Sequence, residues 1–180
     1  MVYIFLADGF EEVEALTQID LLRRADIDIM SVGVGDYCIK GAHGIEVKCD
    51  TVISELEILN ADMLILPGGM PGVENLYNSE KLRELIVAEA DAGTMIAAIC
   101  AAPLILGRLG LANCVNMICY PGFESELSGA AISAKNVVRD KNYITAKAAG
   151  SAIDFAYEII SALKNEDVAN KIVNGIYYER

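Results

Sequence analysis

The chain has 180 residues, of which 54% are hydrophobic, and its 14 basic and 26 acidic side chains give a formal net charge of −12. This length and composition exclude a disordered chain and predict one globular domain spanning residues 1–180. The negative charge argues against non-specific binding to nucleic acid or to an anionic membrane, because both need clustered lysine and arginine. It favours a small-molecule substrate.

The N-terminus and the cysteines predict a cytoplasmic protein. Met1–Asp8 has no basic residue before its apolar run ends at an aspartate, so we expect a first strand and not a signal peptide. The longest apolar run, 95–107, is too short to span a bilayer. The cysteines are odd in number and contain no Cys-x-x-Cys pair: Cys38, Cys49, Cys100, Cys114 and Cys119. Neither a disulfide framework nor a metal site is predicted.

In the first half of the chain, apolar runs alternate with helical patterns. Strands are predicted at 2–7, 27–34 and 62–66, a hairpin at about 37–47, and helices at 10–25 and 80–92. Asp8 and Glu11 have the spacing of a capping box, and Ser79 is placed to cap the helix after it. The helix 10–25 is apolar on most sides, which indicates a subunit interface as well as a core.

In the second half, a strand, an abrupt turn and a helix are predicted within Met95–Gly107. Shorter pieces follow at 115–119, 130–134, 137–139 and 143–146. Ser151 and Asp154 form a second capping-box pattern that opens a helix, and Asn165 starts a last helix that ends near Gly175.

The alternation of strands and helices predicts an α/β fold with a doubly wound, mostly parallel sheet and helices on both faces. Ligands of such sheets bind at the carboxyl ends of the strands, where the strand order reverses. Asp8-Gly9, Pro67–Gly69 and Cys100 each follow a predicted strand. We expect all three to lie at that edge.

Cys100 lies at the corner between a strand and a helix whose first turn contains Pro103. Ala98 and Ala102 flank it at the spacing of the small residues in a nucleophile elbow. The free N–H groups of a helix start would favour the thiolate over the thiol. The alternative is a small buried hydrophobic residue, since free cysteine is often buried.

Glu14 is the second candidate. On a helical wheel it lies near Phe10, Thr17 and Leu21, whereas Glu11 and Glu12 fall on other sides. A carboxyl group among apolar neighbours has a raised pKa and can act as an acid or a base. The alternative is that all three glutamates are first-turn charges favoured by the helix dipole.

Two further features have a structural and a functional interpretation. Backbone N–H groups of Gly68-Gly69 could hold an oxyanion, or the pair could serve only the turn. Their spacing is not that of a nucleotide-binding loop. His43, the only histidine, lies in a predicted loop and is interpreted as a surface residue.

Three motifs in this order resemble the ThiJ/PfpI superfamily, in the branch of the parkinsonism-associated protein DJ-one and its bacterial relatives. They are Asp8-Gly-Phe-Glu-Glu-Val-Glu14, Leu66-Pro-Gly-Gly69 and Ala97-Ala-Ile-Cys-Ala-Ala-Pro103, and the similarity continues through Thr145–Phe155. The resemblance implies a flavodoxin-like fold and a homodimer.

For the site, the resemblance implies a nucleophilic, easily oxidised Cys100 and a protonated Glu14 that donates a hydrogen bond to it. Gly69 and Ala101 correspond to the backbone donors, with Gly68 supporting the turn and counted with them. Activities of the superfamily include a cofactor-independent glyoxalase, a deglycase, peroxide sensing and chaperone behaviour.

The chain departs from the superfamily pattern in ways that bear on activity. Many relatives have a histidine where Cys119 and Tyr120 stand. Ala101 replaces the histidine of PfpI-type peptidases, and no histidine follows His43, so peptidase and amidotransferase activities are disfavoured. Ala148-Ala-Gly150 replaces a Gly-Pro-Gly segment.

The sequence therefore predicts a slow, cofactor-independent enzyme of the glyoxalase or deglycase type, with Cys100 and Glu14 as catalytic residues and a small carbonyl compound or glycated adduct as substrate. The alternative is a redox sensor or chaperone in which Cys100 is oxidised to the sulfinate.

Overall fold

The computed structural model describes residues 1–57 and 61–179, and within them one large sheet has the strand order β10-β11-β7-β6-β1-β2-β5. Its strands are β1 (Val2–Leu6), β2 (Ile29–Gly33), β5 (Thr51–Val52), β6 (Met63–Leu66), β7 (Met95–Ile99), β10 (Val137–Asp140) and β11 (Tyr143–Ala146). Every neighbouring pair is parallel except β10 with β11. The predicted doubly wound, mostly parallel sheet is confirmed.

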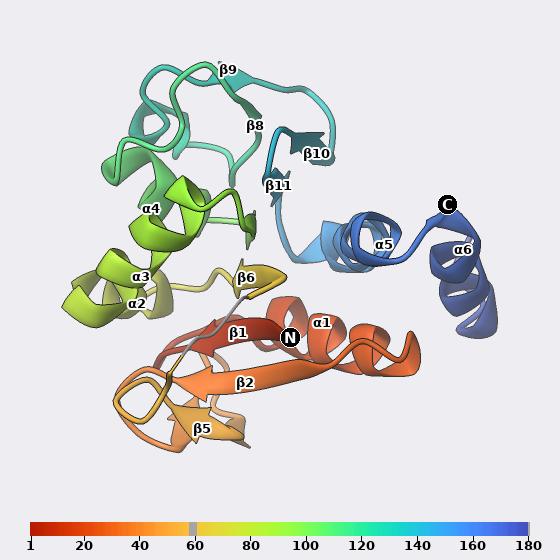
Figure 1. The fold of residues 1–180 in the computed structure, drawn as a ribbon, viewed down its shortest axis with the longest axis horizontal. Coiled ribbons are helices and arrows are strands. Elements are labelled where there is room, and N and C mark those ends of the chain that lie inside the picture. Colours follow the sequence, from red (N-terminus) through yellow and green to blue (C-terminus); the bar gives the residue numbers. More distant parts are fainter. Residues whose placement is uncertain (58–60, 180) are drawn as a thin grey trace.

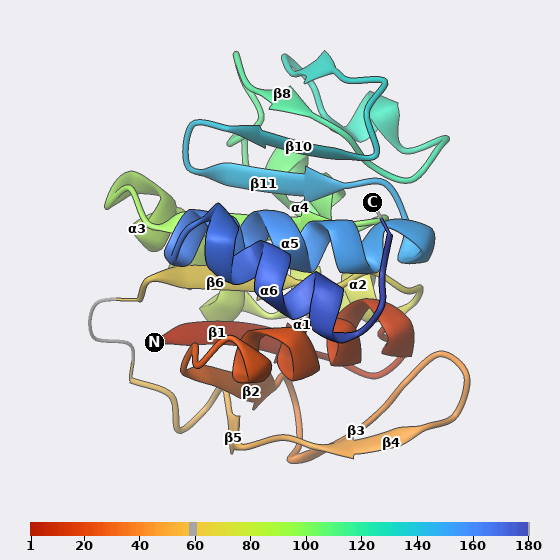
Figure 2. The same cartoon turned by 90° about the vertical axis from the view of Figure 1, so that its right-hand side faces the viewer.

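Helices cover both faces of this sheet (Figures 1 and 2). One face carries α1 (Glu12–Arg24), α5 (Ala152–Leu163) and α6 (Glu166–Gly175), and the other carries α2 (Gly72–Asn78), α3 (Glu80–Asp91) and α4 (Pro103–Arg108). Side chains of β1 alternate between the two layers: Ile4 packs in the core under α1 and α5, and Phe5 in the core under α2 to α4. A strand buried on both faces needs the continuous apolar run that predicted it.

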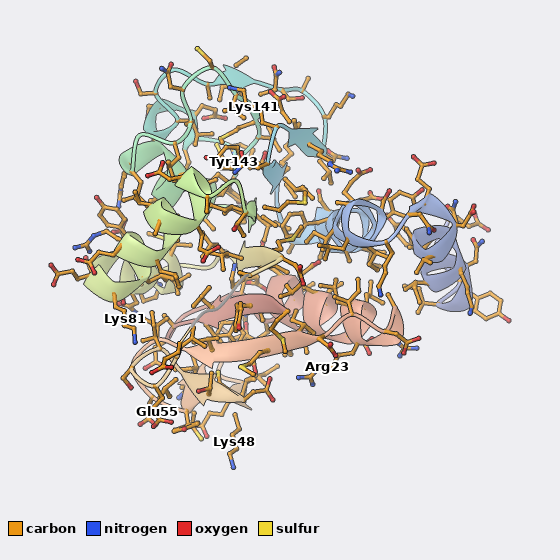
Figure 3. All side chains as sticks on the ribbon, viewed as in Figure 1. Arg23, Lys48, Glu55, Lys81, Lys141 and Tyr143 are labelled. Carbon is orange, nitrogen blue, oxygen red and sulfur yellow. The ribbon has the colours of Figure 1, made fainter. Side chains whose placement is uncertain are left out.

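Smaller elements lie at the periphery. The described residues include a hairpin of β3 (Cys38–Lys40) and β4 (Glu46–Lys48), a parallel pair of β8 (Asn116–Met117) and β9 (Ala131–Ile132), and 3₁₀ turns at Glu124–Glu126 and Ala149–Ser151. In Figure 3, Lys48 and Lys81 lie at the rim of the molecule, and both are exposed. None of the helices in the described residues is long and apolar enough to cross a bilayer.

Both predicted capping boxes are wrong. The Oδ1 of Asp8 accepts from the backbone N of Lys40 at 2.8 Å, and α1 begins after Glu11 without a side-chain cap. Ser151 is the N-cap of α5 but makes no side-chain capping bond. The contact with Lys40 comes from a distant strand that local spacing does not reveal. The predicted cap at Ser79 is confirmed, because its hydroxyl accepts from the N of Leu82.

Local sequence patterns do not reveal α2 and β5. The helix has only seven residues, too few for a helical period to stand out, and β5 has two.

The centre of the sheet matters most for the site. Since β1 lies between β2 and β6, the strand order reverses there, and the carboxyl ends of β1, β6 and β7 lie side by side. This is where ligands bind in such folds.

Candidate active site

Cys100 occupies the turn between β7 and α4. Its φ angle is +64°, a left-handed conformation that non-glycine residues rarely adopt outside turns and functional sites. The turn is fixed on both sides: the N of Cys100 donates to the O of Ala146 at 2.9 Å, and its O accepts from the N of Tyr120 at 2.7 Å. The predicted elbow geometry is confirmed, and Cys100 is half-buried rather than enclosed in the core.

Glu14 projects from the first turns of α1 toward the turn at Cys100. Its side chain is buried, with 1% exposed, and its Oε2 accepts from the N of Gly68 at 2.8 Å. Burial raises the pKa of Glu14 to about 7, although hydrogen bonds with Cys100 and Gly68 act in the opposite direction. The carboxyl group can therefore gain or lose a proton near neutral pH, as an acid–base catalyst must.

Tertiary packing opposes the thiolate that the helix start favours. Burial raises the pKa of the Cys100 thiol to about 12, and the charge and hydrogen bond of Glu14 add to this increase. The backbone N–H groups of Ala101 and Gly69 bond to the sulfur and lower the pKa, but less strongly. Burial and the neighbouring carboxyl group thus favour the thiol over the thiolate, and a base at the moment of attack would remove its proton.

The glycines determine how closely these groups approach. A Cβ at position 68 would lie 2.5 Å from the Oε2 of Glu14 and 2.6 Å from the Cβ of Cys100. Gly69 has a φ angle of +92°, and a Cβ there would lie 2.4 Å from the N of Glu11. The N–H of Gly68, grouped with the backbone donors in the sequence analysis, is committed to Glu14. Only Gly69 and Ala101 direct their N–H groups to the sulfur.

A second cluster, missed by sequence reasoning, lies at the start of α1. The Nδ1 of His43 is 2.9 Å from the Oε2 of Glu12 and 3.5 Å from the Oε2 of Glu11. The ring of His43 is exposed, as predicted, but it pairs with these glutamates and not with Cys100. Glu12 is nearly as buried as Glu14. Possible ligand atoms of the three residues lie within 4.8 Å of one another, but hydrogen bonds from the 41–45 loop account for the position of Glu12.

The structure distinguishes Cys119 from Tyr120, the two residues at which the resemblance implies a histidine. Cys119 is buried, and burial raises the pKa of its thiol to about 11. The Tyr120 side chain is 46% exposed, and its ring packs edge-to-face on Phe123 with 6.4 Å between centroids. Of the two, only Tyr120 offers an accessible polar group beside the elbow.

Comparisons with known proteins agree with this fold. The model of the DJ-1/PfpI family matches residues 1–162. Protein dj-1beta of Drosophila melanogaster is 31% identical over 96% of this chain and 94% of its own length. The "glutathione-independent glyoxalase DJR-1.2" of Caenorhabditis elegans is 27% identical over 92% of this chain and 89% of its own. The solved structure of oxidized Toxoplasma gondii DJ-1 superimposes with a TM-score of 0.95 at 32% identity, covering 99% of this chain and 98% of that one.

Proposed function

The chain belongs to the DJ-1/PfpI family, and from the geometry of Cys100 and Glu14 we propose that it converts small dicarbonyl compounds, such as methylglyoxal, to hydroxy acids. The observation that carries the proposal is a half-buried thiol on a strained turn, hydrogen-bonded to a carboxyl group that titrates near neutrality. A relative named as a glutathione-independent glyoxalase supports this class of reaction.

In the first step, the sulfur of Cys100 attacks the aldehyde carbon of methylglyoxal. The carboxylate of Glu14 takes the thiol proton as the carbon–sulfur bond forms and passes it to the aldehyde oxygen, which gives a hemithioacetal and leaves Glu14 as a carboxylate. The raised pKa of the Cys100 thiol disfavours a free thiolate. Because Glu14 takes the proton during the attack, no free thiolate has to form beforehand.

In the second step, Glu14 removes the hydrogen of the former aldehyde carbon as a proton and returns one to the neighbouring carbon. The intermediate is an enediolate, and the product is a thioester of lactate on Cys100. Backbone N–H groups of Gly69 and Ala101, which point at the sulfur, are placed to stabilise the developing oxygen charge. Water then cleaves the thioester, releasing lactate and restoring the thiol. The overall reaction adds one water and consumes no oxidant.

The test is lactate formation from methylglyoxal under reducing conditions, in buffer without free amines or thiols. Cys100→Ser should abolish it, and Glu14→Gln should lower it by about 10²-fold or more, since it removes the acid–base group. Cys114→Ser is the matched control, because this exposed cysteine lies in a turn after α4 and should be silent. No lactate above the buffer rate from the wild type would refute the proposal.

A redox role is the second candidate, and the description of the Toxoplasma gondii relative as oxidized favours it. It requires Cys100 to react with peroxide faster than the exposed Cys38 and Cys114, although its raised pKa disfavours the reactive thiolate. Peptide mass spectrometry after graded peroxide treatment separates the candidates. Selective sulfinate at Cys100 without lactate formation would favour the sensor, and equal oxidation of all exposed thiols would exclude it.

A further inference from the structure

Two buried oxygen atoms on the inner side of α1 lack a hydrogen-bond partner among residues 1–57 and 61–179: the Oε1 of Glu14 and the Oε1 of Gln18. Their side chains are 1% and 0% exposed. Residues four apart are neighbours on one face of a helix. Buried acceptors without a donor are costly, so a pair of them on adjacent turns calls for a physical explanation.

The remaining polar atoms of both side chains are engaged, which identifies the free ends. The Oε2 of Glu14 accepts from the N of Gly68 and is the oxygen on the Cys100 side, since both would contact a Cβ at position 68. The Nε2 of Gln18 donates to the O of Ala152 at 3.0 Å, at the start of α5. The two Oε1 atoms are thus the ends that these bonds leave without a partner.

A carboxylate oxygen and an amide oxygen both only accept hydrogen bonds, so they cannot satisfy one another. One proton on the Oε1 of Glu14 removes the conflict, because it makes this atom a donor and gives the amide oxygen the partner it lacks. We infer that Gln18 is a positioning residue, whose amide oxygen accepts the hydrogen bond of protonated Glu14 and so favours the acid form and fixes the plane of its carboxyl group.

The direction of the Gln18 amide determines the sign of this effect. With the amide turned over, its NH₂ group would donate to Glu14 and favour the carboxylate. That arrangement would bring the amide oxygen against the O of Ala152, again two acceptors. The bond to Ala152 therefore selects the orientation that favours the acid.

The other titratable groups that act on Glu14 are Cys100, from the elbow, and Glu11, from the same helix, whose negative charge also favours the acid form. The hydrogen bond between Gln18 and protonated Glu14 does not depend on whether the protein catalyses a reaction. Only its catalytic meaning, that Gln18 sets the pH at which Glu14 changes between acid and base, rests on the proposed function.

Gln18 is the only glutamine in the chain, which makes the first test specific. In protein labelled with ¹³C and ¹⁵N in the glutamine side chain, the amide signals are followed by NMR from about pH 5 to about pH 9. We expect them to shift with a midpoint near the pKa of Glu14, about 7, in the wild type and in Glu12→Met, and to lose this transition in Glu14→Met. A wild-type signal that does not move over this range overturns the inference, whichever variants fold.

The second test measures the sign. The ¹³C carboxyl signal of Glu14 is titrated in the wild type and in Gln18→Met, which is similar in length but neither accepts nor donates at that position. Its midpoint should fall by about one pH unit, the size expected for one net hydrogen bond. An unchanged midpoint, or one that rises, overturns the inference. Neither test uses turnover, so a protein without lactate formation can still pass both, and the two failures remain distinguishable.

Discussion

Glu12 and Glu14 are two residues apart on α1, both are buried, and their pKa values shift in opposite directions. Burial raises the pKa of each. For Glu12, hydrogen bonds from the ring and backbone of His43, from its own backbone and from Ile45 outweigh burial and lower the pKa. For Glu14, the bonds with Cys100 and Gly68 do not, and its pKa rises to about 7.

Both carboxyl groups are shielded from solvent, but Glu14 lies deeper and has fewer donors, so depth and donors together decide which carboxyl group stays charged. Glu12 faces a loop that supplies N–H groups and an imidazole, and it fastens this loop to the helix. Glu14 faces the elbow, and its raised pKa lets it gain or lose a proton near neutral pH. One helix turn therefore holds a structural carboxylate and a candidate acid–base group.

The largest effect is expected from displacing Glu14. In Gly68→Ala the new Cβ would lie 2.5 Å from the Oε2 of Glu14, 2.6 Å from the Cβ of Cys100 and 3.0 Å from the O of Ile99, so the site must open. A displacement of about 1 Å can cost about 10²-fold in rate, and we expect at least that loss of lactate formation. Gly175→Ala is the control, because a Cβ there meets nothing within 4 Å. Equal activity of the two variants would contradict the close approach at Gly68.

The next prediction uses stability against pH, where the two glutamates should act oppositely. Folded Glu14 has a pKa above its ordinary value of 4.5, so the folded state binds the extra proton between about pH 4.5 and about 7, and stability falls as the pH rises through this range. Glu14→Gln removes this loss, and relative to wild type it should gain up to about 3 kcal/mol between pH 4.5 and pH 8.

Glu12 has a lowered pKa, so its contribution is present above about pH 4.5 and is lost as the pH falls through the folded value. Its pair with His43 adds stability only while His43 is protonated, so Glu12→Gln should destabilise the protein more at about pH 6 than at about pH 3. Urea unfolding of each variant and the wild type at its two pH values measures these differences. A difference from wild type that is the same at both pH values, for either variant, would refute its assigned shift.

The sequence predicts the elements that depend on local patterns. The apolar runs of β1, β6 and β7 reveal the centre of the sheet, and Pro103 with the flanking alanines reveals the elbow at Cys100. The helical wheel selects Glu14, because its environment comes partly from its own helix.

The same wheel misses Glu12, because what buries Glu12 is a loop 31 residues further along the chain. The state of Cys100 is missed for a similar reason. A helix start favours the thiolate, but the burial and the carboxyl group that outweigh it come from packing α1 and the 68–69 turn against the elbow. Local spacing identifies which residues are candidates, and only tertiary contacts decide their charge.

The smallest effect is expected at His43, where it tests most directly whether Glu12 and Glu14 act independently. The hydrogen bond with Glu12 raises the pKa of His43, and the charges of Glu11 and Glu12 add to this. Since His43 is the only histidine, its titration by NMR gives one unambiguous signal. Its midpoint should lie above the ordinary value of 6.5 in the wild type and fall toward it in Glu12→Gln.

Glu14→Gln should leave this midpoint unchanged, because Glu14 faces Cys100 and does not contribute to the shift of His43. Glu11 is different: its charge acts on both His43 and Glu14, so Glu11→Gln should lower the midpoints of both. If Glu14→Gln moved the His43 midpoint as far as Glu12→Gln does, the two carboxyl groups would form one electrostatic unit. The separation of a structural from a chemical glutamate on α1 would then be wrong.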